Sequence, residues 1–243
     1  MAFRVIESKD NKTYKELMNL KKGNAKEGLF LVEGRDLVEE AMRDNLLEAL
    51  VVVDGTSCPK MDVPIYGLKQ GLYRELSSYQ SLPEMMGVCR MKMADLSSLG
   101  ERVIYLDKIQ DPGNAGTMIR TALSFGYSSV VLSKDSVSLY NSKTIQSTKG
   151  ALFHLPVLRE NLIAFKERGY NIYLTTLDGV DESTVSELKT PFVLCFGNEG
   201  QGISKQNLNL GSKLRIEMSG IDSLNVAVAA GIFMYRFKKG GNK

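Results

Sequence analysis

Residues 103–120 read VIYLDKIQDPGNAGTMIR and join a short apolar run to a helical pattern through a polar loop. The run Val103–Leu106 has the length and composition of a buried strand, and the apolar residues from Met118 onward recur at helical spacing. Two glycines and a proline between them predict a tight turn that leaves polar side chains and helix N-terminal amides facing a ligand. This stretch therefore predicts one strand–loop–helix unit of an α/β protein.

The same alternation continues to the end of the chain. Strands are expected at 130–132, 172–175, 192–196 and 214–218, and helices near 142–149, 162–168 and 226–237. Strands that alternate with helices favour a largely parallel, doubly wound, Rossmann-like sheet. In such a sheet ligands bind beyond the carboxyl ends of the strands, which is where the polar loops of this chain begin.

The first hundred residues form a second α/β series. Short strands are expected at 29–32, 50–53, 65–68 and 87–91, with helices at 14–21, 37–42 and 72–76 and a break at 24–28. Three or four strands with covering helices predict a small α/β sandwich. The pattern is interrupted at 96–100, so we expect one domain over residues 1–97 and a second over 98–243.

Composition excludes several classes of protein. The chain has 243 residues, 43% of them hydrophobic, with a net charge of +3, one histidine and three cysteines. No apolar run approaches the roughly 20 residues that a membrane span needs, and the first residues do not resemble a secretory signal. Three scattered cysteines are typical of reduced thiols in the cytoplasm, and no metal site is expected.

Positive charge is concentrated at the two ends of the chain. Seven lysines and arginines precede Glu27 against three acidic residues, and four lie between Arg236 and Lys243 with no acidic residue among them. Such clusters can contact the phosphates of a nucleic acid. The alternative is that they are solvated termini that keep the protein soluble.

Two later loops in the expected second domain also carry polar residues that could bind a ligand or take part in a reaction. Residues 196–203, FGNEGQGI, place Glu199 among three glycines, and this pattern is neither a Walker loop nor a dinucleotide fingerprint. Residues 216–230, IEMSGIDSLNVAVAA, lead from a turn into a helix of small residues. Taken singly, each loop has a structural interpretation, in which Asn114 and Ser223 cap helices and Asn225 satisfies local backbone groups.

Together the three loops resemble the ordered motifs of the SpoU family. The matching patterns are Asp111-Pro112-x-Asn114-x-Gly116-x-x-x-Arg120, then Gly197-x-Glu199-x-x-Gly202, then Ser223-Leu224-Asn225-Val226. The resemblance implies an S-adenosylmethionine-dependent RNA 2'-O-ribose methyltransferase whose C-terminal part forms a trefoil knot. Phe30–Gly34 and the helix that follows resemble a ribosomal-protein-like RNA-binding domain. Glu217 departs from the proline found at this position in many relatives.

The resemblance also implies roles for individual residues. Arg120 would orient the nucleotide and stabilise the developing alkoxide, because an arginine does not lose its proton in proteins. His154 is the rival general base, and its simpler interpretation is a packed side chain. The implied catalytic and positioning residues are Asn114, Arg120, Glu199, Ser223 and Asn225. The implied cofactor contacts are Thr176, Gly197, Ile216, Met218 and Leu224. The expected RNA contacts are Lys21, Lys22 and Arg35.

The partners follow from the same resemblance. Ribosomal RNA of the 23S type is the favoured substrate, and transfer RNA is the alternative. A non-catalytic RNA-binding or ribosome-assembly factor with the same fold is the competing class of function. A homodimer is expected through the knotted domain, because the final helix carries an apolar face, and no membrane partner is expected. No metal is expected, since methyl transfer from a sulfonium needs none.

Overall fold

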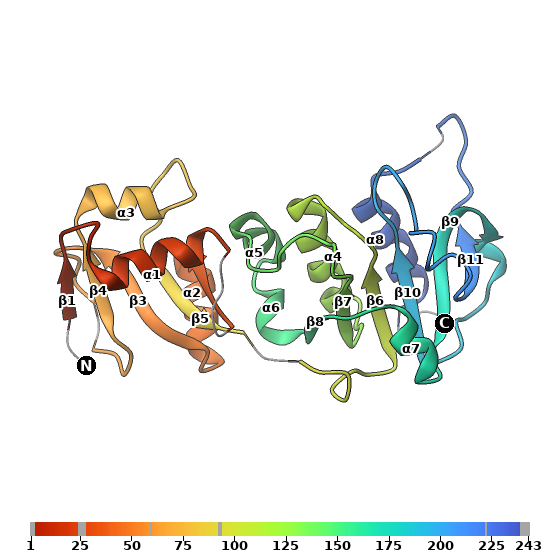
Figure 1. Cartoon of the computed structure of the whole chain (residues 1–243), viewed down its shortest axis with the longest axis horizontal. Coiled ribbons are helices and arrows are strands. Elements are labelled where there is room, and N and C mark those ends of the chain that lie inside the picture. The colour runs from red at the N-terminus through yellow and green to blue at the C-terminus, as the bar shows by residue number, and fades with distance from the viewer. Residues whose placement is uncertain (1–2, 24–27, 59, 92–93, 222, 239–243) are drawn as a thin grey trace. The chain divides into compact units, whose positions relative to one another are not determined.

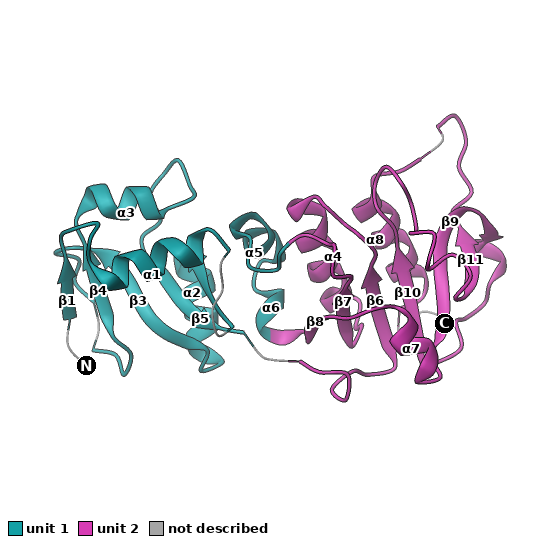
Figure 2. Ribbon diagram, viewed as in Figure 1, with its two compact units in different colours: residues 1–92, 138–153 teal, residues 93–137, 154–243 magenta. Residues whose placement is uncertain are grey.

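The computed structural model describes residues 3–23, 28–58, 60–91, 94–221 and 223–238. The chain divides into two compact units (Figure 2). Unit 1 comprises residues 1–92 and 138–153, and unit 2 comprises residues 93–137 and 154–243. Residues 24–27, which contain most of the predicted break and Lys26, lie outside the described residues, as do Lys239 and Lys243.

Unit 1 is built on a five-stranded sheet with the order β1-β4-β3-β5-β2. β4 runs parallel to β1 and β3, whereas β5 is antiparallel to β3 and β2. The four predicted strands are present, and β1 is a fifth that the sequence did not indicate, because Arg4 interrupts its four residues and they form no apolar run. The strands are β1 (Phe3–Ile6), β2 (Leu29–Glu33), β3 (Leu47–Val53), β4 (Ile65–Leu68) and β5 (Met86–Arg90).

Helices cover this sheet and supply its core. α1 begins after Asn11, whose side chain accepts hydrogen bonds from the backbone of Thr13 and Tyr14. The Tyr14 ring is buried and its hydroxyl donates to the Leu72 carbonyl at 3.3 Å, and burial raises the pKa of Tyr14 to about 12. The helices of this part of the chain are α1 (Lys12–Lys21), α2 (Arg35–Arg43) and α3 (Gln70–Leu76).

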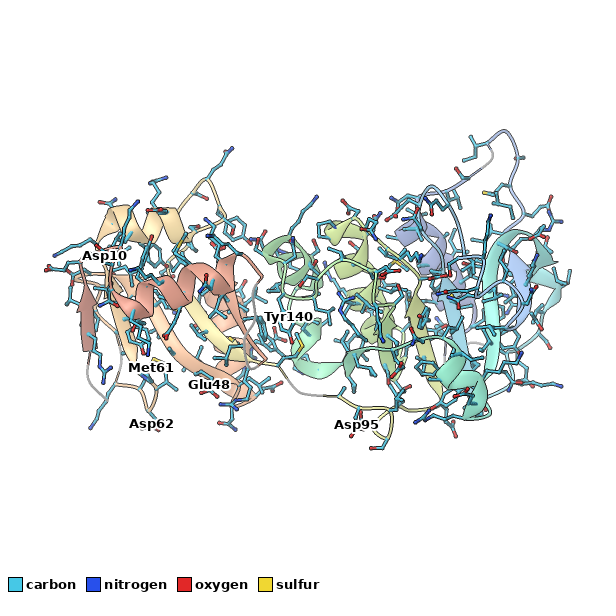
Figure 3. All side chains as sticks on the ribbon, viewed as in Figure 1. Asp10, Glu48, Met61, Asp62, Asp95 and Tyr140 are labelled. Atoms are coloured by element: carbon cyan, nitrogen blue, oxygen red, sulfur yellow. The ribbon has the colours of Figure 1, made fainter. Side chains whose placement is uncertain are left out.

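A segment from the middle of the chain also packs in unit 1. It carries α5 (Ser142–Thr148) and α6 (Ala151–His154), and the sequence division at 97/98 assigned it to the second domain. The Phe153 ring lies 5.9 Å from the Phe30 ring, and the backbone of Tyr140, labelled in Figure 3, approaches Gly23 closely. This long-range packing has no signal in local periodicity.

The predicted interruption at 96–100 contains a side-chain-stabilised turn. The Asp95 carboxylate accepts from the backbone nitrogens of Ser97 and Ser98 at 2.8 and 3.0 Å and from the Ser97 hydroxyl at 2.6 Å (Figure 3). These bonds, above all the one from the Ser97 hydroxyl, hold the pKa of Asp95 below its usual value. The connection into β6 is therefore a defined turn.

Unit 2 contains a six-stranded sheet in which every paired strand runs parallel, as predicted (Figure 1). β11 ends at Arg215 rather than at Met218, so Ile216 and Met218 lie beyond the strand. β8, of three residues, was not predicted, and β9 extends further than expected. In spatial order the strands are β11 (Ser212–Arg215), β9 (Asn171–Asp181), β10 (Phe192–Phe196), β6 (Arg102–Leu106), β7 (Ser129–Leu132) and β8 (Val157–Arg159).

Helices cover both faces of the sheet in unit 2. Phe165 of α7 (Ile163–Glu167) packs on Tyr105, with 6.3 Å between the ring centroids. On the other face, Phe233 of α8 (Val226–Arg236) packs on Phe196 at 6.0 Å. α4 (Pro112–Ser124) packs against α8, and a short 3-10 helix, η1 (Glu182–Thr184), follows β9. Across the described part of the chain, no helix is long and apolar enough to cross a membrane.

Candidate active site

The first polar loop ends in a capped helix. Asp111 is the N-cap of α4, because its carboxylate accepts from the backbone nitrogen of Asn114 at 2.8 Å. Pro112 occupies the first helical position, where its missing N–H costs nothing. The structure therefore corrects the assignment of Asn114 as the cap: Asn114 lies in the first turn, and its side chain is available for other contacts.

Asn198 organises the glycine loop after β10. Its backbone exchanges two hydrogen bonds with Gly202, at 3.0 and 2.9 Å, which closes the loop. Its side-chain oxygen accepts from the backbone of Gly200 and Gln201, and its Nδ2 donates to the Lys108 carbonyl at 2.9 Å. Sequence reasoning missed Asn198, and its only signal was the tendency of asparagine to bond to backbone two residues on.

Gly197 is required by this closed loop. A Cβ at this position would lie 2.2 Å from the carbonyl carbon of Gly202 and 2.3 Å from the nitrogen of Ile203. Both are backbone atoms, which cannot move aside as a flexible side chain can. At Gly200, in contrast, a Cβ would meet nothing closer than Asn198 Oδ1 at 3.7 Å.

Three predicted site residues from three separate loops form one hydrogen-bonded chain. The Nδ2 of Asn114 donates to Oε1 of Glu199 at 2.9 Å, and the Nδ2 of Asn225 donates to Oδ1 of Asn114 at 3.2 Å. Asn114 uses both ends of its amide, so its orientation is fixed by a carboxylate on one side and an amide donor on the other. The three loops therefore meet at the carboxyl edge of the sheet.

Asn225 has a second function as the N-cap of α8. Its Oδ1 accepts from the backbone nitrogens of Ala227 and Val228 at 2.9 and 3.3 Å. Ser223, the residue that the structural interpretation took as a cap, is exposed and does not cap α8. The cap leaves the amide of Asn225 free to donate to Asn114, so one side chain joins α8 to the first turn of α4.

Arg120 lies apart from this chain of hydrogen bonds. Its side chain is exposed and forms no hydrogen bond or ion pair with another described side chain. Arg120 lies six positions after Asn114 in α4, which places the two about 9 Å apart along the helix axis and on different faces. In the single chain, Asn114 and Glu199 therefore hold each other and not Arg120.

Of the predicted cofactor residues, Thr176 lies in the middle of β9, two positions after the last residue that pairs with β10. Gly197, Ile216, Met218 and Leu224 lie beyond the carboxyl ends of β10 and β11. The Oγ1 of Thr176 in β9 is buried and forms no hydrogen bond of normal geometry with a described residue. Ile216, Met218 and Leu224 are half-buried and lie outside helices and strands, so their backbone groups can serve a ligand. Irregular backbone beyond the strand ends, together with a buried hydroxyl on β9, fits a polar cofactor with an adenine ring.

An ion pair fixes the strand that carries Thr176. Lys213 of β11 donates to Asp178 of β9 at 2.8 Å. This bond holds the pKa of Asp178 below its usual value, with a smaller contribution from the nearby Thr176 hydroxyl. The pair therefore joins the edge strand β11 to its neighbour β9.

Asp107 is a buried carboxylate that the sequence analysis did not single out. Its side chain is fully buried at the end of β6, and its Oδ2 accepts from the Ser204 backbone at 2.8 Å and from Asn207 Nδ2 at 3.0 Å. Oδ1 has no partner among the described residues. Asp107 also raises the pKa of the Cys195 thiol, although burial is the larger cause.

The predicted RNA contacts differ in their availability. Lys21 donates to the carbonyls of Glu75 and Ser77 at 2.6 and 3.0 Å, so its ammonium group closes the end of α3. Arg35 pairs with Glu84 and with Glu39, and these bonds raise its pKa. Lys22 is exposed. His154 is also exposed, which corrects its interpretation as a packed side chain.

A parallel sheet with three polar loops gathered at its carboxyl edge defines a class of α/β enzyme that binds a nucleotide-like cofactor at that edge. Residues 101–235 match the SpoU rRNA Methylase family, and the chain belongs to this family.

Relatives align along the whole chain. The 23S rRNA (guanosine(2553)-2'-O)-methyltransferase RlmP of Bacillus subtilis is 34% identical, over 96% of this chain and 98% of its own length. The 23S rRNA (adenosine(1067)-2'-O)-methyltransferase of Streptomyces laurentii is 26% identical, over 74% of this chain and 71% of its own. The crystal structure of an AdoMet-bound rRNA methyltransferase from Sinorhizobium meliloti superimposes with a TM-score of 0.84, at 26% identity, covering 96% of this chain and 97% of that one.

Proposed function

We propose that this protein transfers a methyl group from S-adenosylmethionine to a ribose 2'-hydroxyl of 23S ribosomal RNA. The observation that carries the proposal is the chain of hydrogen bonds from Glu199 through Asn114 to Asn225. It joins one residue from each of the three loops that resemble the family's motifs. The names of the Bacillus and Streptomyces relatives support the reaction and the RNA, and the Sinorhizobium structure supports the cofactor.

Some residues at the carboxyl edge of the sheet would bind the cofactor, and others would act on the ribose during methyl transfer. When bound, S-adenosylmethionine supplies an electrophilic methyl group. Arg120 keeps its proton and donates to the ribose oxygen as negative charge develops there, while the hydroxyl proton passes to a phosphate of the substrate or to water. Glu199, oriented by Asn114, positions the ribose, and the Thr176 hydroxyl and the backbone at Ile216, Met218 and Leu224 hold the cofactor.

Unit 1 is proposed to bind the RNA substrate. Lys22 is the exposed cation among the three predicted contacts, whereas Lys21 and Arg35 are held by neighbours within unit 1. A separate binding unit suits a structured ribosomal RNA as substrate, because the unit can bind a part of the RNA that is distant from the nucleotide that is methylated. We place this activity in the cytoplasm, and three free cysteines support that assignment.

The segment from β10 to α8 is proposed to form the trefoil knot that the family resemblance implies. Three contacts support it: Asn198 to Lys108, Asn207 to Asp107, and Asn225 to Asn114. Each joins the β6–α4 connection or the first turn of α4 to a residue 90 to 111 positions later. These long-range hydrogen bonds hold the segment from β10 to α8 against the β6–α4 connection.

A homodimer through α8 is proposed as the working form. Val228, Ile232 and Tyr235 are 54%, 37% and 58% exposed, and their spacing puts them along one side of the helix. An apolar stripe of this kind favours a second copy of the same chain. A second copy would also offer a route for Arg120 to reach an Asn114–Glu199 pair. Light scattering at micromolar concentration should give twice the chain mass, and a monomer mass would contradict the dimer.

The proposed function is tested by mapping 2'-O-methyl groups in total RNA from cells with and without this protein. The expected result is the loss of one methylated ribose in 23S ribosomal RNA when the protein is missing. Loss of a methyl group in transfer RNA would identify the alternative substrate. An unchanged map would favour the non-catalytic assembly factor.

A further inference from the structure

A second pocket lies at the opposite edge of the unit 2 sheet from the candidate active site. It encloses about 590 Å³ beside the amino-terminal ends of β6 and β10, where Arg102 and Phe192 begin their strands. The rest of its wall comes from the chain before Pro191 and from the end of α8. Neither the family motifs nor the proposed chemistry uses this pocket.

Arg102 gives the pocket an unpaired guanidinium. The group stacks on the rings of Tyr127 and Phe192, at 5.5 and 5.1 Å from their centroids. Its Nε is buried and has no hydrogen-bond partner among the described residues. Stacking holds the planar group in place but leaves its donors unused, and a desolvated donor without an acceptor is costly. An oxyanion in the pocket would satisfy it.

Two lysines reinforce the positive charge. Lys189 and Lys238 line the pocket, and the Lys238 ammonium lies 3.8 Å from the centroid of the Tyr235 ring. Neither lysine forms an ion pair within the described part of the chain. Glu187 is the one carboxylate among the residues that line the pocket in the described part of the chain.

Arg236 does not add to the free charge of the pocket. Its Nε pairs with Glu182 at 3.2 Å, and its NH2 group donates to the Val185 carbonyl at 2.8 Å. The Arg236–Glu182 ion pair has no net charge, and Arg236 lines the pocket in a fixed position. The pocket therefore has an excess of two positive charges, from three unpaired cations and one carboxylate, and favours an anion.

We propose that this pocket binds a backbone phosphate of the RNA substrate, away from the ribose that is methylated. The inference rests on the proposed function, because the substrate must supply phosphates at more than one place. The five residues of β6 separate the pocket from the catalytic edge by about 13 Å, a distance that an RNA strand with a phosphate every few ångströms can span. Arginine presents a planar fork that matches a phosphate.

The test compares the double variant Lys189→Gln/Lys238→Gln with Lys166→Gln/Lys205→Gln. The control removes two exposed lysines of unit 2 that do not line the pocket. The probe is a fluorescein-labelled 23S rRNA fragment that spans the nucleotide modified by the Bacillus relative. We expect the pocket variant to raise the Kd about fivefold. The slope of log Kd against log salt should fall by about 1.4, the value for two lost contacts on a single strand.

Methyl transfer separates this inference from the proposed function. At saturating RNA the pocket variant should keep the wild-type turnover and the wild-type affinity for S-adenosylmethionine, because it leaves the catalytic edge intact. If wild-type protein does not methylate RNA at all, the proposed function fails. If it does, and the pocket and control variants show equal Kd and equal salt slope, the phosphate site is refuted.

Arg102→Lys and inorganic phosphate provide the remaining comparisons. Lysine keeps the positive charge but lacks the planar guanidinium of arginine. The Kd for RNA should therefore rise, while the slope of log Kd against log salt stays at the wild-type value. Inorganic phosphate should compete with RNA for wild-type protein and less well for the double variant. Tight phosphate binding together with unchanged RNA affinity of the variants would mean that the pocket serves a free anion, which would overturn the RNA proposal.

Discussion

Asp107 and Asn207, one hundred positions apart in the chain, are joined by a 3.0 Å hydrogen bond between buried side chains. The same carboxylate oxygen accepts from the Ser204 backbone. This carboxylate fixes the segment that follows the glycine loop to the end of β6. The position of the loop, and so of Glu199 within it, depends on a residue that does not itself face the reaction.

Asp107→Ala should destabilise unit 2 by about 2–5 kcal/mol, because it leaves two buried donors without an acceptor. Asp107→Asn, which retains one acceptor oxygen but buries a new donor, should cost about 1–3 kcal/mol. Asp135→Asn is the control: this carboxylate is exposed and pairs with Lys108 at 3.4 Å, so the change should cost less than about 1 kcal/mol. Urea unfolding measures all three, and equal midpoints would contradict the role of Asp107.

Gly197→Ala should abolish cofactor binding, because its Cβ would overlap the backbone of Gly202 and Ile203. The loop must then open, at a cost of about 1–3 kcal/mol for an overpacked site. Calorimetric titration with S-adenosylmethionine should show at least about a tenfold loss of affinity. Gly200→Ala, where the added methyl group makes only an ordinary van der Waals contact with Asn198 Oδ1 at 3.7 Å, should bind the cofactor normally. Equal affinities in the two variants would show that the closed loop is not needed for binding.

Asn225→Asp separates the cap of α8 from the bridge to Asn114. The new carboxylate can still accept from Ala227 and Val228, so the unfolding midpoint should change little. It cannot donate to Asn114 Oδ1, so the amide loses its orientation and turnover should fall about 10- to 100-fold. Asn225→Ser, a shorter cap without the amide, should behave alike. Full activity in both variants would exclude the bridge from the mechanism.

Local pattern was sufficient for much of the fold. β10 spans Phe192–Phe196 and β4 spans Ile65–Leu68, as predicted, because each is an apolar run bounded by turn residues. β1 and β8 were missed because three or four residues at the edge of a sheet give no clear alternation. The packing of residues 138–153 in unit 1 depends on contacts such as Phe30 with Phe153, which no local signal reports.

In the candidate site too, the sequence indicated some residues and missed those whose partners lie far away in the chain. The family resemblance assigned Asn114, Glu199 and Asn225 to one site, and the structure adds the order of their hydrogen bonds. Asp107 was not recognised, because a carboxylate after a strand is typical of an exposed loop and its partner lies one hundred positions away. The N-cap of α4 was misplaced because Asp and Asn three residues apart have equal capping preference.

The most direct measurement is single-turnover methylation of unmodified 23S ribosomal RNA by wild type and by Arg120→Ala, with both RNA and cofactor saturating. Wild type should place the methyl group on a ribose 2' oxygen. Arg120→Ala should lower the rate constant about 10²- to 10³-fold, the cost of one lost oxyanion donor, with an unchanged unfolding midpoint and cofactor affinity. Transfer to a base, no transfer by wild type, or a wild-type rate for Arg120→Ala would contradict ribose methylation assisted by Arg120.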